Sequence, residues 1–301
     1  CSSDLLDLAQ LVAEGDRLAF STDSYVIDPL FFPGGNIGKL AICGTANDVA
    51  VSGAIPRYLS CGFILEEGLP METLKAVVTS MAETARAAGI AIVTGDTKVV
   101  QRGAADKLFI NTAGMGAIPA NIHWGAQTLT AGDVLLVSGT LGDHGATILN
   151  LREQLGLDGE LVSDCAVLTP LIQTLRDIPG VKALRDATRG GVNAVVHEFA
   201  AACGCGIELS EAALPVKPAV RGVCELLGLD ALNFANEGKL VIAVERNAAE
   251  QVLAALHSHP LGKDAALIGE VVERKGVRLA GLYGVKRTLD LPHAEPLPRI
   301  C

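Results

Sequence analysis

The sequence predicts a mixed α/β protein made of two domains. It has 301 residues, enough for two domains that each bury a hydrophobic core. Half of the residues are hydrophobic and 19% are charged, a balance typical of a well-packed globular protein. Strand-like and helix-like segments alternate along the chain, and this succession occurs twice. Two α/β halves with mixed sheets therefore fit better than one doubly wound sheet, although periodicity alone does not select a particular fold.

The apolar periodicity places the individual elements. In the first half we expect strands at 17–21, 57–65, 90–94 and 109–117, and helices at 37–53 and 71–88. In the second half we expect strands at 134–138, 206–209, 240–244 and 266–271, and helices at 146–155, 170–177, 192–202, 219–227 and 248–257. A glycine-bounded stretch at 125–132 separates the halves. We therefore assign residues 1–125 to an N-terminal domain, 126–290 to a C-terminal α/β domain and 291–301 to a mobile tail.

Charge and hydropathy argue against two classes of partner. The chain carries 24 basic and 34 acidic residues, a net charge of −10, and it has no basic run. Nucleic acid and anionic membrane surfaces are therefore not expected partners. Gly, Asp or Lys interrupts every apolar stretch before it reaches the length of a membrane span. The sequence begins at Cys1, and no signal peptide is visible.

The eight cysteines are interpreted mainly as buried free thiols. Most of them lie in apolar contexts, and a chain of this size needs no disulfide framework, so we expect a reducing, cytoplasmic location. Cys203 and Cys205 hint at a metal site, but no second Cys or His pair stands at zinc-site spacing. We therefore do not expect a metal there.

The last residue, Cys301, lies on a tail that contains Pro292, Pro296 and Pro298. Prolines disfavour helix and central strand and favour an extended path that rises about 3.1 Å per residue. Ten such residues would carry a thiol about 30 Å, so the tail is interpreted as an arm that presents sulfur in more than one place. The alternative is a frayed end with an incidental cysteine.

Three aspartates follow or interrupt apolar segments beside small residues. Asp23 and Asp96 follow expected strands, and Asp48 lies in an otherwise apolar helix. Carboxylates that converge from such positions suit Mg²⁺, which takes oxygen ligands and shares them with substrate phosphates. Taken singly, each aspartate is better explained as a helix cap or turn residue than as a metal ligand. Asp48 is the exception, because an aspartate on so apolar a helix needs a partner or a metal.

Two glycine-rich turns in the second half could receive phosphate. One contains Gly139, and the other contains Thr188, Arg189 and Gly190; each precedes an expected helix. Backbone N–H groups at helix starts bind phosphate oxygens, and an arginine adds charge. Neither a Walker P-loop nor a GxGxxG fingerprint is present. The segment 236–239 adds an acidic candidate, Glu237.

Together these segments resemble the aminoimidazole ribonucleotide synthetase-like (PurM-like) superfamily and, within it, the HypE family of hydrogenase maturation factors, the carbamoyl dehydratases. The residues that carry the resemblance are Thr22-Asp23-Ser24, Asn47-Asp48-Val49-Ala50, Gly95-Asp96-Thr97-Lys98, Asp186-Ala187-Thr188-Arg189-Gly190-Gly191 and Pro298-Arg299-Ile300-Cys301. The likeness spans essentially the whole chain, and the terminal motif is its specific part. The sequence departs from the family by opening at Cys1–Asp7, without the glycine-rich segment that helps to cover the nucleotide in relatives.

The resemblance implies a PurM-like protomer that forms a homodimer, with the strands of its N-terminal domain closing a barrel across the interface. It implies ATP and Mg²⁺ as cofactors, with Asp23, Asp48 and Asp96 as metal ligands. These three residues, Asn47 and the residues of the two glycine-rich turns would bind the nucleotide. Cys301 would accept a carbamoyl group from the carbamoyltransferase HypF. ATP-dependent dehydration would then give an S-cyanate, whose cyanide passes to iron on a HypC–HypD scaffold for the [NiFe]-hydrogenase centre.

Dehydration of a carboxamide needs a base to take protons from nitrogen. Lys98 and Glu237 are the candidates, and Lys98 could instead neutralise phosphate. His144 is a third candidate, although a lone histidine near a turn is more often structural. Two other functions remain open: a small-molecule kinase or selenophosphate synthetase of the same superfamily, and a non-enzymatic carrier whose active part is the terminal thiol.

Overall fold

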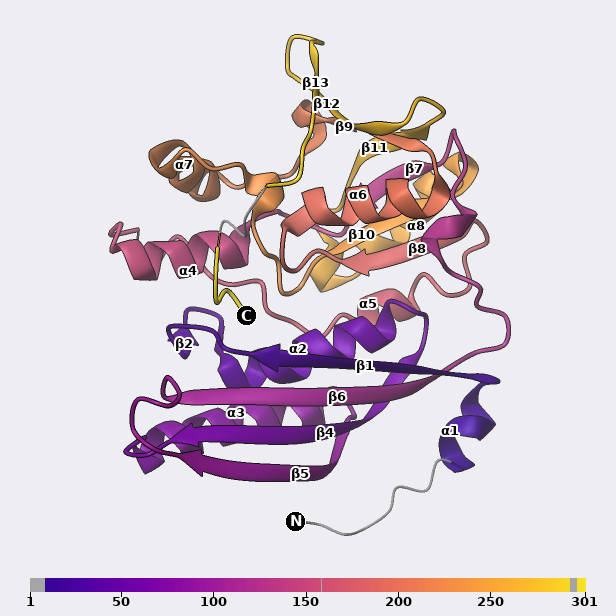
Figure 1. Cartoon of the computed structure of the whole chain (residues 1–301). Coiled ribbons are helices and arrows are strands. Elements are labelled where there is room, and N and C mark those ends of the chain that lie inside the picture. Colours follow the sequence, from indigo (N-terminus) through magenta and orange to yellow (C-terminus); the bar gives the residue numbers. More distant parts are fainter. Residues whose placement is uncertain (1–8, 158, 293–296) are drawn as a thin grey trace. The chain divides into compact units, whose positions relative to one another are not determined.

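The computed structural model describes residues 9–157, 159–292 and 297–301, which form two compact units (Figure 1). The first unit comprises the described residues up to Ile122, together with Cys165–Thr169 and Arg299–Cys301. The second comprises the described residues of His123–Asp164 and Pro170–Pro298. The chain therefore returns to the first unit twice after leaving it.

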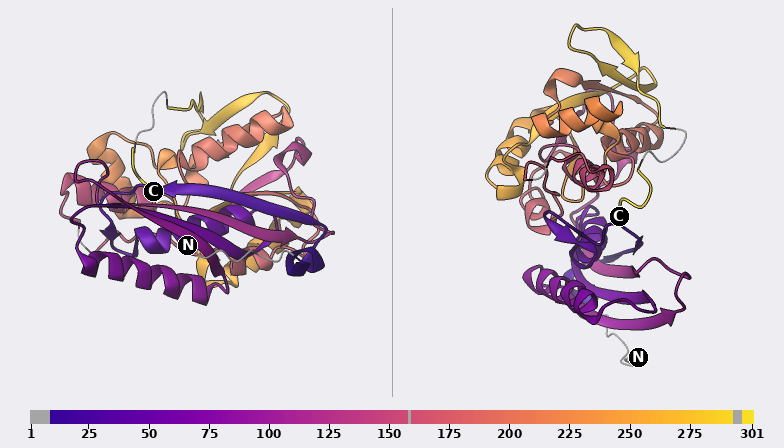
Figure 2. Two further views of the ribbon diagram at one scale, coloured as in Figure 1. Left: turned by 60° about the horizontal axis from the view of Figure 1, so that its bottom comes forward. Right: turned by 90° about the vertical axis from the view of Figure 1, so that its left-hand side faces the viewer.

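A four-stranded sheet forms the centre of the first unit. Its strands are β1 (Arg17–Tyr25), β4 (Ile55–Glu66), β5 (Ala91–Val100) and β6 (Leu108–Ile118), in the order β1-β6-β4-β5. The β4–β5 pair is parallel and the other pairs are antiparallel. Helices α2 (Ile37–Ala50) and α3 (Met71–Ala87) pack against one face of the sheet, as the two views of Figure 2 show. A short helix, α1 (Ala9–Glu14), and the small hairpin of β2 (Phe31–Phe32) and β3 (Gly35–Asn36) complete the unit.

Helix α2 is almost entirely buried because its small residues allow close packing. The Asn36 side chain caps its start by accepting hydrogen bonds from the backbone amides of Gly38 and Lys39. A Cβ on Gly44 would lie 2.5 Å from the hydroxyl oxygen of Tyr25 on β1, so glycine is required there. Asp48 stands out as a half-buried charge in this buried helix.

A seven-stranded mixed sheet forms the second unit, in the order β13-β12-β9-β11-β7-β10-β8. Its strands are β7 (Val134–Val137), β8 (Val181–Asp186), β9 (Gly206–Ser210), β10 (Leu240–Val244), β11 (Ala266–Val272), β12 (Gly276–Ala280) and β13 (Lys286–Thr288). Its helices are α4 (Asp143–Glu153), α5 (Thr169–Gln173), which begins on a residue of the first unit, α6 (Gly191–Cys203), α7 (Pro218–Leu227) and α8 (Ala249–His257). Strand β12 runs parallel to β9, whereas the other pairs are antiparallel.

The core of the second unit lies around the central strands. Every residue of β7 and β10 is buried, which means that both faces of the sheet are covered there. Val192, Val196 and Phe199 of α6 join the hydrophobic cluster of the sheet. Among the helices in the described part of the chain, none has the length and apolar character that crossing a bilayer requires.

The expected mixed α/β class is confirmed, and most expected elements are present with shifted ends. Two expected strand ends are wrong, because β1 continues to Tyr25 and β5 continues to Val100. Both are edge strands, where solvent accommodates polar side chains, so Asp23 and Asp96 lie within strands rather than after them. The helix expected at 170–177 ends at Gln173 and continues as tight turns. Strands β8, β12 and β13 were not expected; all three are short, and each includes at least one charged residue.

Candidate active site

Asp23 and Asp48 lie on the helix-covered face of the first sheet. Successive side chains of a strand point to opposite faces, so Ser21, Asp23 and Tyr25 of β1 share one face. The Ser21 hydroxyl donates to Asp48 Oδ2 at 2.8 Å, and the Tyr25 hydroxyl lies 3.0 Å from that of Thr45 on α2. Asp48 therefore has a protein partner, as expected for a carboxylate on an apolar helix, while its half-buried position leaves it accessible to a ligand.

Asp96 and Lys98 lie on the opposite, open face. Cys61 of β4 contacts Met81 of α3 and pairs with Gly95, so Gly95 faces the helices and its neighbour Asp96 faces away. Lys98 Nζ lies 2.8 Å from Asp96 Oδ2, with the two side chains 70% and 50% exposed. The hydrogen bond from Lys98, followed by that from the Thr97 amide, lowers the pKa of Asp96.

The expectation that the three aspartates converge within one chain is therefore wrong. Asp23 and Asp96 lie on opposite faces of the sheet, and strands β6 and β4 separate their strands. Three strand spacings of about 4.8 Å each amount to about 14 Å, whereas Mg²⁺ needs its ligands within about 2.1 Å. Accordingly, no group of three or more His, Cys, Asp or Glu residues in the described chain could hold a metal ion. Mg²⁺ often uses only one or two carboxylates with substrate phosphates, so each aspartate singly fits the ion.

Asn47, a predicted nucleotide contact, has protein partners in this structure. Its side-chain amide donates to the backbone oxygen of Ala166 at 3.0 Å, and its side-chain oxygen accepts from the amide of Leu168 at 2.8 Å. The Asn47 residue is 2% exposed. Asn47 thus holds the Cys165–Thr169 segment against α2, next to Asp48.

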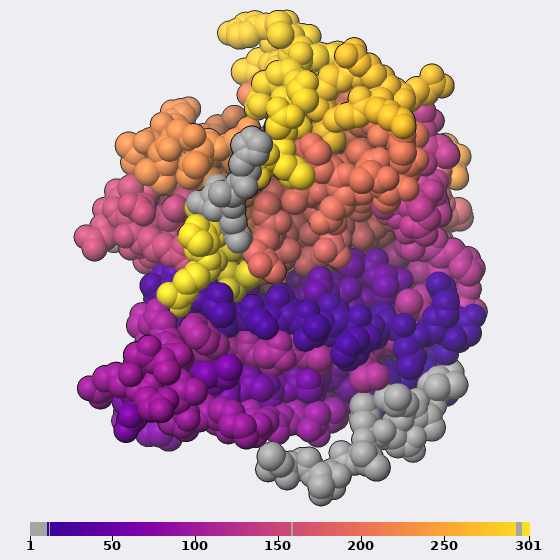
Figure 3. All heavy atoms as spheres, viewed as in Figure 1, coloured from indigo at the N-terminus to yellow at the C-terminus, as the bar shows by residue number. Residues whose placement is uncertain are grey.

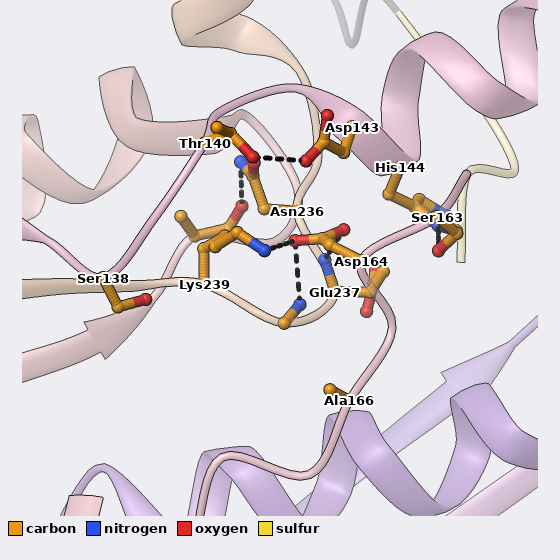
Figure 4. Close-up of polar contacts among 12 residues, drawn as sticks. Ser138, Thr140, Asp143, His144, Ser163, Asp164, Ala166, Asn236, Glu237 and Lys239 are labelled. Atoms are coloured by element: carbon orange, nitrogen blue, oxygen red, sulfur yellow. Dashed lines mark hydrogen bonds and ion pairs between the residues drawn. The ribbon is translucent and has the colours of Figure 1, made fainter. Parts of the chain in front are cut away.

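In the second unit, Asn236 joins the two glycine-rich turns (Figure 4). Its side-chain oxygen accepts from the Gly142 amide at 2.7 Å, and its side-chain nitrogen donates to the Ala187 backbone oxygen at 3.0 Å. Gly142 has a φ of 81°, which favours glycine, at the start of α4. The two predicted phosphate-binding turns therefore lie side by side, linked by a residue that the sequence did not single out.

Charged groups surround the first of these turns. Asp143, which is buried, accepts from the Thr140 hydroxyl at 2.6 Å and from Lys217 Nζ at 2.9 Å. A Cβ on Gly139 would lie 3.0 Å from Cε of Lys239, so the lysine side chain lies against the turn. The turn thus lies at a helix start, where backbone N–H groups can receive an anionic ligand. The ammonium groups of the two nearby lysines are already paired, Lys217 with Asp143 and Lys239 with Asp164.

The second turn presents an exposed Arg189 and a half-buried Thr188. A Cβ on Gly191, which begins α6, would meet the backbone oxygens of Leu232 and Phe234 at 2.5 Å. The paired glycines thus let the chain enter α6 against a neighbouring backbone. Arg189 is placed where it can reach a ligand of this turn.

Glu237 follows Asn236 and is 2% exposed. Its amide donates to Asp164 Oδ1 at 3.1 Å, and the Gly238 amide donates to Asp164 Oδ2 at 3.2 Å. Lys239 Nζ lies 3.3 Å from the same carboxylate. Burial alone would raise the pKa of Asp164, but the charge of Lys239, and then that of His144, outweighs it and lowers the pKa. The segment that carries the predicted base is thus held by a buried carboxylate absent from the predicted set.

His144, the third candidate base, is fully buried, and its Nδ1 lies 2.7 Å from the Ser163 hydroxyl (Figure 4). This arrangement agrees with the structural alternative.

Cys301 is docked on the first unit and is 7% exposed. Its backbone oxygen accepts from the Val26 amide at 2.9 Å, just after β1. Arg299 donates to the Val26 backbone oxygen at 2.9 Å and lies 2.7 Å from Asp106 Oδ2. In Figure 3 the end of the chain, in yellow, accordingly lies against the indigo segment of the first unit. Part of the predicted tail, 293–296, lies outside the described residues.

The predicted catalytic residues come from different places. Cys301 lies beside the end of β1, and Lys98 lies on β5, with β6 and β4 between the two strands. Glu237 belongs to the second unit. Sequence reasoning missed Asp164, Asn236 and Ser21, since each is an ordinary polar residue whose partners are distant in the chain.

Comparison with known proteins identifies the family. Residues 6–118 match the AIR synthase related protein N-terminal domain, and residues 130–281 match the corresponding C-terminal domain. The carbamoyl dehydratase HypE of Rhodobacter capsulatus is 50% identical over 296 residues, which are 97% of this chain and 87% of that protein. The chain belongs to the HypE family of carbamoyl dehydratases. The expected family and the PurM-like fold are thereby confirmed.

Solved structures of the HypE family agree closely with this chain. A structure of E. coli HypE, a hydrogenase maturation protein, is 98% identical with a TM-score of 0.98, and covers 99% of this chain and 92% of that chain. A HypE structure in complex with ATP is 47% identical with a TM-score of 0.91, covering 95% and 87%. A HypE–HypF complex is 48% identical with a TM-score of 0.89, covering 91% and 90%.

Proposed function

We propose that this protein uses ATP to dehydrate an S-carbamoyl group on Cys301 to an S-cyanate, which supplies the cyanide ligand of a [NiFe]-hydrogenase. Membership of the carbamoyl dehydratase HypE family supports the reaction. The observation that carries the assignment to this thiol is the docking of Cys301, whose backbone is bonded to Val26 and whose residue is almost completely buried. An incidental cysteine on a frayed end would have neither property.

The reaction converts a poor leaving group into a good one. The carboxamide oxygen attacks the γ-phosphorus of ATP, ADP leaves, and one proton is lost from nitrogen. The C–O bond then breaks to release phosphate as the second nitrogen proton is removed, which leaves a C≡N group on sulfur. The overall change is S-carboxamide and ATP to S-cyanate, ADP and phosphate. Positioning and charge stabilisation by the protein account for most of such a phosphoryl transfer.

Of the two predicted bases, Glu237 is the stronger candidate. Its residue is buried, and its backbone is fixed by Asp164, so its carboxyl group has a defined place. Lys98 is exposed, is paired with Asp96, and lies across the sheet from the strand that contacts Cys301. A lysine in such a position suits phosphate neutralisation better than proton removal from a substrate held beside Cys301.

ATP and Mg²⁺ are proposed as the cosubstrate and the metal cofactor. The ATP complex of a HypE relative supports the nucleotide. Asp48 or Asp96 would bind Mg²⁺ together with phosphate oxygens, and the ion would offset charge on the transferring phosphoryl group. The turns that contain Gly139 and Arg189 offer N–H groups and positive charge for phosphate.

We further propose a homodimer formed through the open face of the first sheet. Leu18, Phe20 and Ile64 are exposed on this face, opposite to α2 and α3. Exposed apolar side chains on a sheet face indicate an interaction surface, and the same face of a second protomer would bury them by closing a barrel. The HypE–HypF complex of relatives supports HypF as the carbamoyl donor, and the HypC–HypD scaffold is proposed as the acceptor. Seven free thiols among the described residues accord with a cytoplasmic location.

One experiment separates this function from its alternatives. The full-length protein is incubated with HypF, carbamoyl phosphate and Mg-ATP, and the mass of its C-terminal peptide is measured. Carbamoylation followed by loss of one water is the expected result. Carbamoylation alone would indicate a thiol carrier, and an unmodified peptide would indicate a kinase or synthetase of the superfamily. Cys301→Ala is the control, and it should accept no carbamoyl group while keeping the fold.

A further inference from the structure

The stretch from Ser163 to Leu168 connects two sites that are far apart in the sequence. Its first part is bonded within the second unit, where Asp164 holds the Glu237 segment. Its second part is bonded within the first unit, where Asn47 holds Ala166 and Leu168. Only Cys165 separates Asp164 from Ala166, so the two sets of bonds belong to one short piece of chain.

The Asp164 carboxylate makes three polar contacts, although the residue lies outside the predicted site. It is 3% exposed and uses both carboxylate oxygens, one for the Glu237 amide and the other for the Gly238 amide and Lys239. Two backbone amides on one carboxylate fix the path of that backbone in a way that a bond to a side chain would not. A buried carboxylate is costly unless it is paired and hydrogen-bonded, and here it is both.

We propose that Asp164 is a positioning residue for the dehydration step, because it fixes the backbone from which the Glu237 carboxyl group projects. This inference rests on the proposed function for the role of Glu237. Asp164 itself need not touch the substrate.

A conservative variant tests the two backbone bonds. Asparagine has the shape of aspartate but only one acceptor oxygen, so in Asp164→Asn at most one of the two amides keeps its bond. In the full-length protein we expect hydrogen exchange at the Glu237 and Gly238 amides to become at least about tenfold faster. We expect kcat for water loss from the carbamoylated peptide to fall by about tenfold or more, with KM for ATP and carbamoylation of Cys301 unchanged.

The matched control is Asp133→Asn. Asp133 is also a buried aspartate of the second unit that binds a backbone amide, at Thr130, and a lysine, Lys182 at 2.9 Å. This variant should lose stability like Asp164→Asn but keep the wild-type kcat. Equal losses of kcat in both variants would reduce Asp164 to a structural residue and overturn the proposal. So would wild-type kcat in Asp164→Asn despite faster exchange.

Two further variants keep the test decisive. Asp164→Asn leaves the buried Lys239 ammonium group without its carboxylate, and the variant could fail to fold for that reason. In that case the double variant Asp164→Asn/Lys239→Gln replaces it in the test. Lys239→Gln alone keeps both amide bonds, so its exchange at Glu237 and Gly238 should stay slow; fast exchange there would assign the positioning to Lys239 instead. The exchange measurement does not depend on catalysis. A wild-type protein that never loses water would refute the proposed function, while unchanged exchange in Asp164→Asn would refute the positioning itself.

Discussion

The amide of Val26 donates a 2.9 Å hydrogen bond to the backbone oxygen of Cys301, which joins the last residue of the chain to the end of the first long strand. The Arg299 side chain donates a second hydrogen bond to the same residue, at the backbone oxygen of Val26. Cys301 is 7% exposed in this position, whereas the proposed function requires its thiol to meet an external carbamoyl donor. We therefore propose that the last residues alternate between a docked and a released position, and that the contacts of Arg299 and Cys301 favour the docked one.

Arg299→Ala should shift this balance toward release. The variant removes the bond to Val26 and the 2.7 Å ion pair with Asp106, a loss of about 1 kcal/mol for a partly exposed pair. We expect alkylation of Cys301 by iodoacetamide to become about fivefold faster. Background from Cys61 and Cys224 is small at pH 8, because burial raises the pKa of each thiol to about 11.

Arg287→Ala is the matched control, since Arg287 forms a comparable 3.0 Å ion pair with Asp230 in the second unit. It should leave the alkylation rate of Cys301 unchanged. Equal acceleration in both variants would mean that the effect is global and that Arg299 does not anchor the thiol.

Asp48→Asn and Asp96→Asn should each slow Mg²⁺-dependent ATP hydrolysis by about tenfold or more, because each removes a charged oxygen ligand that an amide replaces poorly. Carbamoylation of Cys301 should be spared, since that step needs no nucleotide on this protein. The measurement is phosphate release at several Mg²⁺ concentrations, with Asp230→Asn as a control. A variant that hydrolyses ATP like the wild type at limiting Mg²⁺ would show that its aspartate is not a metal ligand.

The contribution of Asp164 to the free energy of unfolding should change with pH only under acidic conditions. Its folded pKa lies below the ordinary value of 3.8, so the ionised carboxylate stabilises the fold above that pH, and this stabilisation is lost as pH falls through the folded pKa. Asp164→Asn should lower the free energy of unfolding by about 3 kcal/mol or more from pH 8 to pH 5, as breaking a buried ion pair does. The difference should shrink below pH 3.8. Urea unfolding of both proteins across this range measures it, and a difference that already shrinks between pH 7 and 5 would contradict the assignment.

Nucleotide should favour the docked position of Cys301. The activated intermediate must be kept from water beside the phosphate, whereas the carbamoyl donor requires the thiol outside, so one fixed position cannot serve both steps. A fluorophore at Ala294, outside the described residues, would report the distance to the first unit with and without Mg-ATP. Mg-ATP should raise the fraction of short distances. Identical distributions would count against docking gated by nucleotide.

Much of the fold could be predicted from the sequence, because apolar periodicity is a local property. The buried strand β10 (Leu240–Val244) has the bounds expected, and α3 differs by one residue. The ends of β1 and β5 were not predictable, since polar residues are tolerated there only because these strands lie at sheet edges. Strand order belongs to tertiary structure, and it places Asp23 and Asp96 on opposite edges of the sheet.

The sequence predicts candidate site residues where a local motif indicates a chemistry, as with the glycine-rich turns and the terminal cysteine, and these assignments stay predictions. Contacts between residues that are distant in the chain were not predictable. Asp164 is 73 residues from Glu237, and Asn236 is 94 residues from Gly142, so no local pattern signals either contact. The buried hydrogen bonds that fix such a site appear only once the chain is folded.

The most direct test of the account is the mass of the C-terminal peptide after incubation of the full-length protein with HypF, carbamoyl phosphate and Mg-ATP. The proposed dehydration predicts a carbamoyl group on Cys301 that loses one water only when ATP is present, and no modification in Cys301→Ala. A peptide that gains the carbamoyl group but never loses water, or a label that persists in Cys301→Ala, would contradict it.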